Sequence, residues 1–125
     1  MQDQLVSFET AKLAKEKGFK EATTPFDEIV VYNIDGEVCR YNRKGFESNL
    51  VDVDKTVPAP TQSLLQKWLR EEKLMDVIVS PHGTYEYCVD IFTNMTGGIL
   101  TFNEFSQVYE EILECGLQKA LRWIV

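Results

Sequence analysis

The sequence predicts an α+β fold, in which two hairpins form an antiparallel sheet and three helices pack on it. Two observations carry this prediction. Apolar residues recur at helical spacing in three segments, and between them lie short β-branched or aromatic runs separated by turn residues. The predicted order is helix, two strands, helix, two strands, helix. The 125 residues are expected to form a single domain, 1–125.

The first helix is expected over residues 9–17, where good helix formers follow one another. Ser7 can cap its start by accepting hydrogen bonds from the free amides of the first turn. Gly18 suits the left-handed position just after the last turn, and Phe19 can then fold back on Ala14.

The first hairpin is expected over residues 28–42. The run 28–32 is rich in β-branched and aromatic residues, and Asp35-Gly36 is a strong turn dipeptide before the run 38–41. The spacing of the two runs predicts a longer loop and excludes a two-residue turn.

The middle of the chain is expected to be a loop followed by a second helix. Residues 43–59 lack clean periodicity, although the alternation of Val51 and Val53 with aspartates leaves a short edge strand as the alternative. Pro60 and Thr61 open the helix, because proline is tolerated where the amide has no partner within the helix. The apolar side chains of one face are Leu64, Leu65, Trp68 and Leu69.

The second hairpin combines the apolar run 75–79, a turn at 80–84 and an alternating run at 85–92. The last helix is expected to begin at Thr101, which forms a capping box with Glu104. Leu100 and Phe105 are placed for a hydrophobic staple at the same helix start.

The charge balance argues against nucleic acid as a partner. The chain has 20 acidic and 13 basic residues and a net charge of −7, whereas binding to phosphates needs a basic surface. Residues 60–124 also fit the order of a double-stranded-RNA-binding domain, with a possible third strand. The segment 74–125 carries only Lys119 and Arg122 against seven acidic residues, so we expect no nucleic-acid partner.

The cysteine pattern indicates a reducing compartment. Cys39, Cys88 and Cys115 are widely spaced and odd in number, which is typical of free thiols. His82 is the only histidine, and we expect no metal and no cofactor. No basic and apolar leader and no apolar run of about 20 residues occurs, so a cytoplasmic protein without a membrane segment is expected.

Two groups of residues are candidates for catalysis. Cys88 and His82 form the one Cys/His pair near in sequence, and the alternative is a core thiol beside an exposed turn histidine. Glu86 and Asp90 share one strand face, where Asp76 could join them, and the alternative is a solvated sheet face. In both cases the non-catalytic alternative is preferred. No H-E-x-x-H, G-x-S-x-G or phosphate-binding motif is present, so no catalytic residue is assigned.

Candidate partner-binding residues come from two patterns. The second helix has an apolar side, which core packing explains, and a polar side that is free to meet a partner. Clustered strand tyrosines can form a binding platform. The residues of these two patterns are Gln62, Gln66, Lys67, Arg70, Tyr32, Tyr41, Tyr85 and Tyr87. A further alternative is an acidic patch formed by Asp52, Asp54, Glu104, Glu110, Glu111 and Glu114.

Three segments of the chain carry a resemblance to a known family. They are SFETAKLAKEKGF at 7–19, APTQSLLQKWLRE at 59–71, and YEE at 109–111 continuing to GLQKAL at 116–121. Together they resemble a family of small uncharacterised proteins encoded by phages and prophages of gut Bacteroides-type bacteria. The resemblance covers nearly the whole chain and implies a cytoplasmic protein made in a host cell from mobile DNA. It brings no activity and no catalytic residues.

The function expected from these observations is a non-enzymatic protein-interaction module of phage or prophage origin that acts on a host or phage protein. One alternative is a small-molecule-binding protein or enzyme, with a pocket between sheet and helices near Tyr85, Tyr87, Glu86 and Asp90. Another is a self-associating protein that forms a homo-oligomer through its last helix, because apolar residues occupy much of that helix's circumference.

Overall fold

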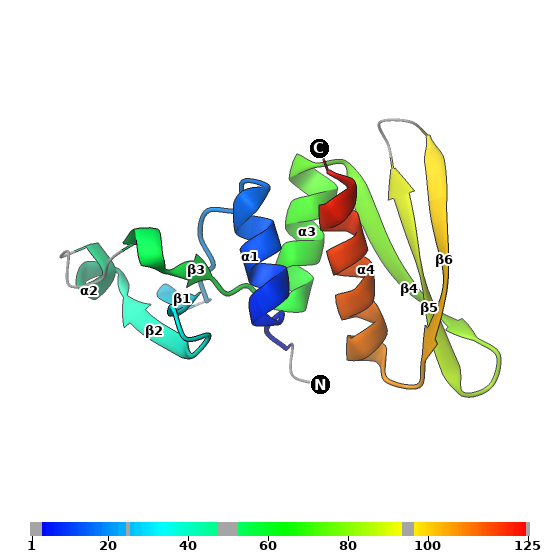
Figure 1. The fold of residues 1–125 in the computed structure, drawn as a ribbon, viewed down its shortest axis with the longest axis horizontal. Coiled ribbons are helices and arrows are strands. Elements are labelled where there is room, and N and C mark those ends of the chain that lie inside the picture. Colours follow the sequence, from blue (N-terminus) through cyan, green and yellow to red (C-terminus); the bar gives the residue numbers. More distant parts are fainter. Residues whose placement is uncertain (1–3, 25, 48–52, 94–96, 125) are drawn as a thin grey trace. The chain divides into compact units, whose positions relative to one another are not determined.

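The computed structural model describes residues 4–24, 26–47, 53–93 and 97–124. Within them the fold is α+β, with four α-helices and two three-stranded antiparallel sheets (Figure 1). The chain divides into two compact units. Unit 1 comprises Met1–Gln4 and Gln62–Val125, and unit 2 comprises Leu5–Thr61. The expectation of a single domain over residues 1–125 stays a prediction.

Unit 2 begins with helix α1 (Phe8–Glu16), and both of its predicted ends are confirmed. The side chain of Ser7 accepts a hydrogen bond from the Thr10 amide at 3.2 Å. At the other end Gly18 adopts φ 107°, and the Phe19 amide donates to the Ala14 carbonyl at 2.9 Å. This pair of features is the glycine-terminated helix end that the sequence predicts.

The predicted first hairpin of unit 2 is confirmed as strands β1 (Glu28–Tyr32) and β2 (Val38–Asn42). The loop between them is organised by Asn33, whose side-chain oxygen accepts from the amides of Asp35 and Glu37 at 2.9 and 3.0 Å. Asparagine side chains commonly form such local bonds in turns. The loop is longer than two residues, as the spacing predicts.

The expectation of a loop over residues 43–59 is wrong in part. This segment contains helix α2 (Arg43–Glu47), a 3-10 turn η1 (Val53–Lys55) and strand β3 (Val57–Pro58). Strand β3 pairs with β1, and proline is compatible with this edge position. Elements this short carry no periodic signal. Of the alternative edge strand, Val51 lies outside the described residues, and Val53 belongs to η1 and not to a strand.

The long segment of unit 1 begins with helix α3 (Gln62–Glu72), which follows Pro60 and Thr61 as predicted. Strands β4 (Met75–His82) and β5 (Glu86–Thr93) form the second hairpin. The turn is shorter than the expected 80–84, because Pro81 and His82 continue the ladder with β5.

The expected start of the last helix at Thr101 is wrong, and so are the capping box and the staple. Residues 98–106 form strand β6 (Gly98–Ser106), which pairs antiparallel with β5. The capping-box spacing is compatible with a strand, and pairing with β5 overrides this local helix signal. The sheet order is β4-β5-β6, so the two hairpins belong to two three-stranded sheets and not to one four-stranded sheet.

Helix α4 (Tyr109–Trp123) begins eight residues later than expected. Its N-cap residue, Val108, offers no side-chain hydrogen bond. Ser106 instead accepts from the Val108 amide at 3.0 Å and donates to the Glu111 carboxylate at 2.9 Å. A serine just ahead of the helix therefore organises its start.

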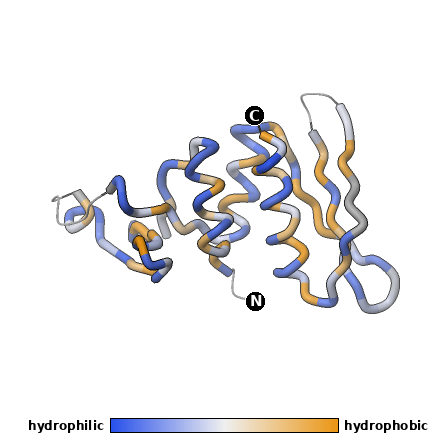
Figure 2. Tube along the Cα trace, in the orientation of Figure 1, coloured by the Kyte–Doolittle hydropathy of each residue, from blue (hydrophilic) through white to orange (hydrophobic). Residues whose placement is uncertain are grey.

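Helices α3 and α4 pack on one face of the unit 1 sheet (Figure 1). Alternate strand residues point to them, and Val77, Val89 and Ile91 are completely buried. Figure 2 shows the hydrophobic stretches of these strands and helices. The order within unit 1 is therefore helix, three strands and helix. Strand β6 is the third strand that the pattern of residues 60–124 left open. No helix among the described residues is long and apolar enough to cross a membrane.

Gly116 marks a close approach of α4 to the sheet. A methyl group at this position would lie 2.5 Å from Cγ2 of Val89 and 2.9 Å from Cγ1 of Val77. Both distances are below van der Waals contact, and both valines are β-branched and stiff. Only glycine therefore fits this helix position without moving the strands.

We expect Gly116→Ala to lower the free energy of unfolding. Helix propensity alone would add about 1 kcal/mol of stability. Overpacking costs roughly 1–3 kcal/mol, and the two stiff valines place the cost in the upper part of this range. Urea denaturation should therefore show a net loss of about 1–2 kcal/mol. In a Val89→Ala background the loss should be smaller, because only the 2.9 Å contact with Val77 remains below van der Waals distance. A gain in stability in the parent chain would contradict the close packing.

Candidate functional site

Gln62, a predicted partner-binding residue, is part of the core of unit 1. Its side chain is 3% exposed. The amide nitrogen donates to the Glu110 carbonyl at 2.9 Å and to the Glu114 carboxylate at 3.0 Å, and so joins α3 to α4. The prediction for Gln62 is corrected accordingly, because a side chain engaged in this way cannot contact a partner.

The other polar residues of α3 differ in accessibility. Gln66 is half-buried, and its amide nitrogen donates to the Val77 carbonyl on β4 at 2.5 Å. Arg70 is exposed and lies 3.7 Å from the Asp76 carboxylate. Lys67 is exposed. Of the four predicted helix residues, Lys67 and Arg70 remain accessible to a partner.

Two of the predicted tyrosines belong to unit 2. Tyr32 is 8% exposed, and its hydroxyl donates to the Val6 carbonyl. Its assignment to a binding surface is therefore corrected. Tyr41 is half-buried and packs against Phe46 with ring centroids 6.0 Å apart.

The other two tyrosines belong to unit 1. Tyr87 is half-buried and makes an edge-to-face contact with Tyr109, with centroids 5.6 Å apart. Tyr85 lies in the β4–β5 turn and is 78% exposed. The eight predicted residues are thus divided between the core and separate surfaces and do not form one site.

The most distinctive surface of unit 1 is the sheet face turned away from α3 and α4, which we call the open face. The strand register assigns residues to it, because side chains paired across strands lie on the same face. Its described residues are Asp76, Ile78, Ser80, His82, Glu86, Cys88, Asp90, Phe92, Ile99 and Phe105.

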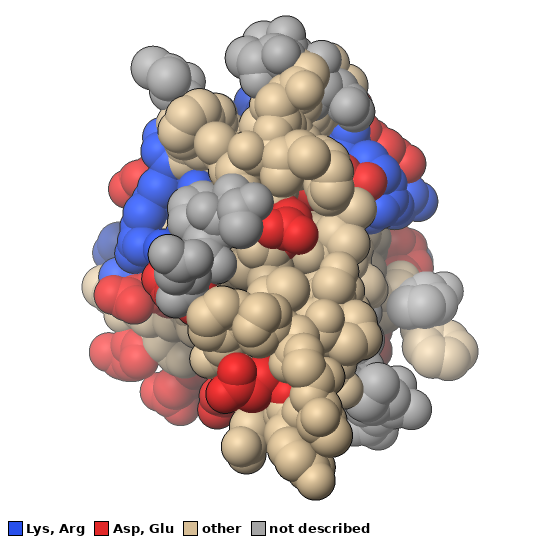
Figure 3. Space-filling view, turned by 90° about the vertical axis from the view of Figure 1, so that its right-hand side faces the viewer, with Lys and Arg blue, Asp and Glu red and all other residues tan. Residues whose placement is uncertain are grey.

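The open face combines apolar and acidic side chains. Ile78, Ile99 and Phe105 are 37%, 58% and 45% exposed. The ring of Phe105 stacks on His82 with centroids 4.2 Å apart. Figure 3 shows uncharged side chains running along this side of the molecule with acidic ones among them. None of the ten described residues of the open face is a lysine or arginine.

The catalytic candidates also lie on the open face. Cys88 is paired with Ser80 and Phe105, whereas His82 is paired with Glu86. No hydrogen bond between Cys88 and His82 occurs among the described residues, and the histidine ring instead stacks on Phe105. The geometry therefore does not provide the base that a cysteine nucleophile needs.

The carboxylates of the open face are spread along the sheet. Asp90 is paired with Ile78, and Asp76 with Phe92, so apolar residues separate them. Asp76 is also near Arg70, at 3.7 Å. In the described part of the chain, no group of three His, Cys, Asp or Glu side chains could hold a metal ion.

Several residues of the alternative acidic patch make internal contacts. Glu110 and Glu114 accept from Gln62, and Glu111 accepts from Ser106. Asp54 offers its backbone carbonyl to Lys15 at 3.3 Å, and Asp52 lies outside the described residues.

Glu104 at the end of β6 forms a cluster with two residues of α4. Lys119 lies 2.8 Å from its carboxylate, and the Cys115 thiol donates to it. The hydrogen bonds from Cys115 and then Lys119 lower the pKa of Glu104. Burial and then the bond to Glu104 raise the pKa of Cys115 to about 11. The thiol is therefore protonated at neutral pH and weakly nucleophilic.

Most of the apolar residues that indicated self-association through α4 pack inside unit 1. Leu117 and Leu121 are completely buried and Ile112 is 2% exposed, whereas Val108 and Trp123 at the two ends of the helix are 44% and 55% exposed. A helix covered by a sheet and a second helix has the same wide apolar pattern as an associating one.

The apolar half of the open face was missed by sequence reasoning. Ile99 and Phe105 belong to a segment that the capping-box pattern assigned to a turn and a helix start. The signals that could have found them are the short alternation over 100–103 and the β-branched and aromatic residues of 99–105, which are typical of a strand.

Comparison with known proteins gives no relative. No protein-family model, curated protein sequence or solved structure matches this chain. The residues and geometry of the chain itself therefore carry the functional argument.

We expect Gln62→Ala to lower the free energy of unfolding by roughly 1–3 kcal/mol, because it removes a buried side chain that bonds α3 to α4 and leaves the half-buried Glu114 carboxylate without one of its donors. Lys67→Ala is the matched control on the same helix and should change stability by less than about 0.5 kcal/mol. Thermal and urea denaturation of the two variants measure the difference. Equal stabilities would contradict the structural role of Gln62.

We expect alkylation of Cys115 by iodoacetamide at pH 8 to be slow. A pKa of about 11 leaves roughly one thiol in a thousand as thiolate at that pH. The rate should rise with pH toward 11, and Glu104→Gln should increase it because the carboxylate raises this pKa. Peptide mapping by mass spectrometry measures the rate at Cys115 alone. A rate in the folded chain equal to that in 8 M urea would contradict the assignment.

Proposed function

We propose that this protein is a non-enzymatic protein-interaction module that binds a partner protein through the open face of unit 1. The observation that carries this proposal is the composition of that face. It exposes Ile78, Ile99 and Phe105 on a sheet whose other face is covered by helices. Exposed apolar residues grouped on one surface are typical of protein-binding sites.

The charges on the open face define the partner's chemistry. Asp76, Glu86 and Asp90 stand among the apolar residues, without a lysine or arginine among the face's described members. Complementary charge favours a partner segment that carries both apolar and basic side chains. Nucleic acid is disfavoured, since its phosphates would meet carboxylates.

A second copy of this chain is a poorer occupant of the same face. Two open faces brought together would place their acidic residues opposite one another, and each chain carries a net charge of −7. Like charges across an interface oppose association. The proposed partner is therefore a different protein.

The proposed setting follows from the sequence. The resemblance to phage and prophage proteins supports a role in the cytoplasm of a bacterial host, with a host or phage protein as the target. The three free cysteines agree with a reducing compartment.

The first test is affinity capture from a gut Bacteroides lysate with Ile99→Ser/Phe105→Ser as the comparison variant. We expect the parent chain to retain a stoichiometric partner and the variant to bind at least ~10-fold more weakly, because two apolar contacts are lost. Ile34→Ser is the matched control, since Ile34 is 72% exposed in the β1–β2 loop of unit 2. Mass spectrometry identifies the partner, and surface plasmon resonance measures its affinity.

The charge contribution is tested with Asp76→Asn/Glu86→Gln/Asp90→Asn. This variant should reduce the association rate and flatten its dependence on salt, because these carboxylates steer a basic partner. A partner that binds both open-face variants like the parent chain would refute this docking face. Loss of binding on Lys67→Ala/Arg70→Ala alone would place the interaction on α3.

A further inference from the structure

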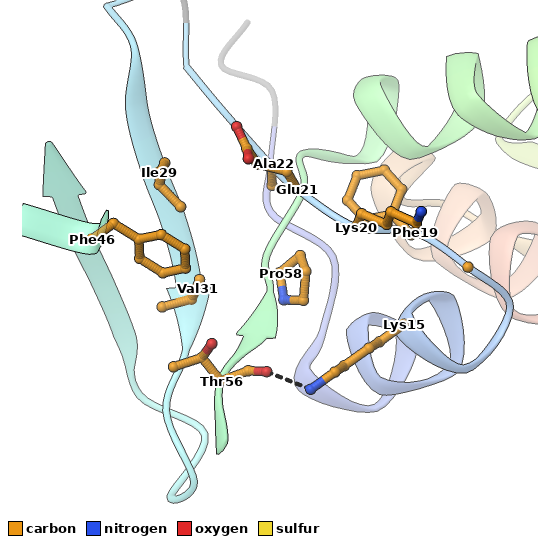
Figure 4. Close-up of a pocket in the computed structure, with 11 residues that line it drawn as sticks. Lys15, Phe19, Lys20, Glu21, Ala22, Ile29, Val31, Phe46, Thr56 and Pro58 are labelled. Atoms are coloured by element: carbon orange, nitrogen blue, oxygen red, sulfur yellow. Dashed lines mark hydrogen bonds between the residues drawn. The ribbon is translucent and has the colours of Figure 1, made fainter. Parts of the chain in front are cut away.

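A pocket of about 320 Å³ lies within unit 2 (Figure 4). It is bounded by the end of α1 and the residues after it, by β1 and β3, and by Phe46 of α2. Phe19 and Phe46 lie toward opposite ends of it in Figure 4, with Pro58 between them. The pocket is remote in sequence from the open face and shares no residue with it.

The walls of the pocket are mostly apolar. Phe19, Ala22, Ile29 and Val31 are each 5% exposed or less, so the strands and α1 hold them in place. Phe46 is half-buried and packs on Tyr41. Such walls favour the apolar body of a ligand, and the volume is at the small end of the range for ligand pockets.

Lys15 supplies a positive charge at this pocket. Its amino group donates to the Thr56 carbonyl at 2.8 Å and to the Asp54 carbonyl at 3.3 Å. Both partners are backbone groups, and among the described residues no carboxylate pairs with this amino group. A lysine ammonium has three N–H donors, so one remains after these two bonds.

The other charged residues at the pocket favour an anion as well. Lys20 adds a second positive charge. The carboxylate of Glu21 is paired with Arg43 at 2.7 Å, which offsets its charge. The balance of charge around the apolar walls is therefore positive, in a chain that is negative as a whole.

We propose that this pocket binds a small amphipathic carboxylate. Its apolar body would lie between Phe19 and Phe46, and its carboxylate would accept a hydrogen bond from Lys15. A charge-assisted hydrogen bond of this kind gives orientation and affinity together. This second site is independent of the protein-docking function proposed above.

The test uses octanoate, octanol and octylammonium as probes of the full chain at pH 7. The three molecules share the apolar body and differ in the charge of the head group. Neither tryptophan lines the pocket, since Trp68 and Trp123 belong to unit 1, so the test uses a probe other than tryptophan fluorescence. Amide chemical shifts in ¹⁵N–¹H spectra report on both units at once.

We expect octanoate to shift amides of residues 15–22, 29–31, 56 and 57 and to leave those of β4–β6 unchanged. Octanol should bind at least ~10-fold more weakly and octylammonium more weakly still, because neither offers a carboxylate to Lys15. Lys15→Met keeps the aliphatic stem and removes the charge. It should weaken octanoate binding at least ~10-fold and leave octanol binding unchanged. Lys12→Met is the matched control on the same helix and should bind octanoate like the parent chain.

Three results would overturn the proposal. They are octanoate shifts that do not map to the pocket, equal binding of octanoate and octanol, and octanoate binding that Lys15→Met leaves intact in a chain whose spectrum remains that of the folded protein. Phe46→Ala provides a second, independent check, because removing one wall should weaken octanoate and octanol alike. Unchanged binding of both probes by this variant would also overturn the proposal.

Discussion

The close contact between α4 and the sheet at Gly116 is the constraint on which unit 1 depends. The helix backbone rests against Val77 and Val89, where even one methyl group would collide. This contact places the apolar side of α4 over β4 and β5, and α3 packs beside it on the same face. Both described helices of unit 1 therefore cover the same face of the sheet, and the apolar residues on its other face stay exposed. The same contact that builds the core thus produces the candidate docking surface.

The sequence predicted those parts of the fold whose signals are local. Ser7 and Gly18 act within one helical turn of the residues they serve, so both ends of α1 were predictable. The β1–β2 hairpin is likewise closed by residues next to one another in the chain. Residues 98–106 differ, because their strand state depends on pairing with β5. Thr101 and Glu104 matched a helix-start pattern locally, and only the hydrogen bonds to a neighbouring strand decide against it.

The candidate site was less predictable than the fold. Gln62 and Tyr32 are polar side chains that sequence patterns place on a surface, yet each is buried by a partner distant in the chain. Gln62 bonds to residues 48 and 52 positions away, and Tyr32 to one 26 positions away. A buried polar group satisfied in this way looks the same in sequence as an exposed one. Lys15 is the opposite case, an ordinary helix lysine in the sequence that lines a pocket in the structure. Its amino group is held there by a hydrogen bond to the Thr56 carbonyl, 41 positions away.

The two outer edges of the unit 1 sheet are protected to different degrees. At β4, the Gln66 side chain of α3 donates a hydrogen bond to the Val77 carbonyl, and Arg70 pairs with Asp76. Helix α3 therefore shields that edge. At β6, no further strand pairs with the outer edge within the described residues, and Ile99 and Phe105 are exposed beside it. Such an edge is a template for strand addition between molecules. At neutral pH the net charge of −7 keeps molecules apart, and acid removes that repulsion by protonating carboxylates. Aggregation near the isoelectric point of about 4.7 would therefore begin at β6, and at neutral pH the acidic surface opposes it.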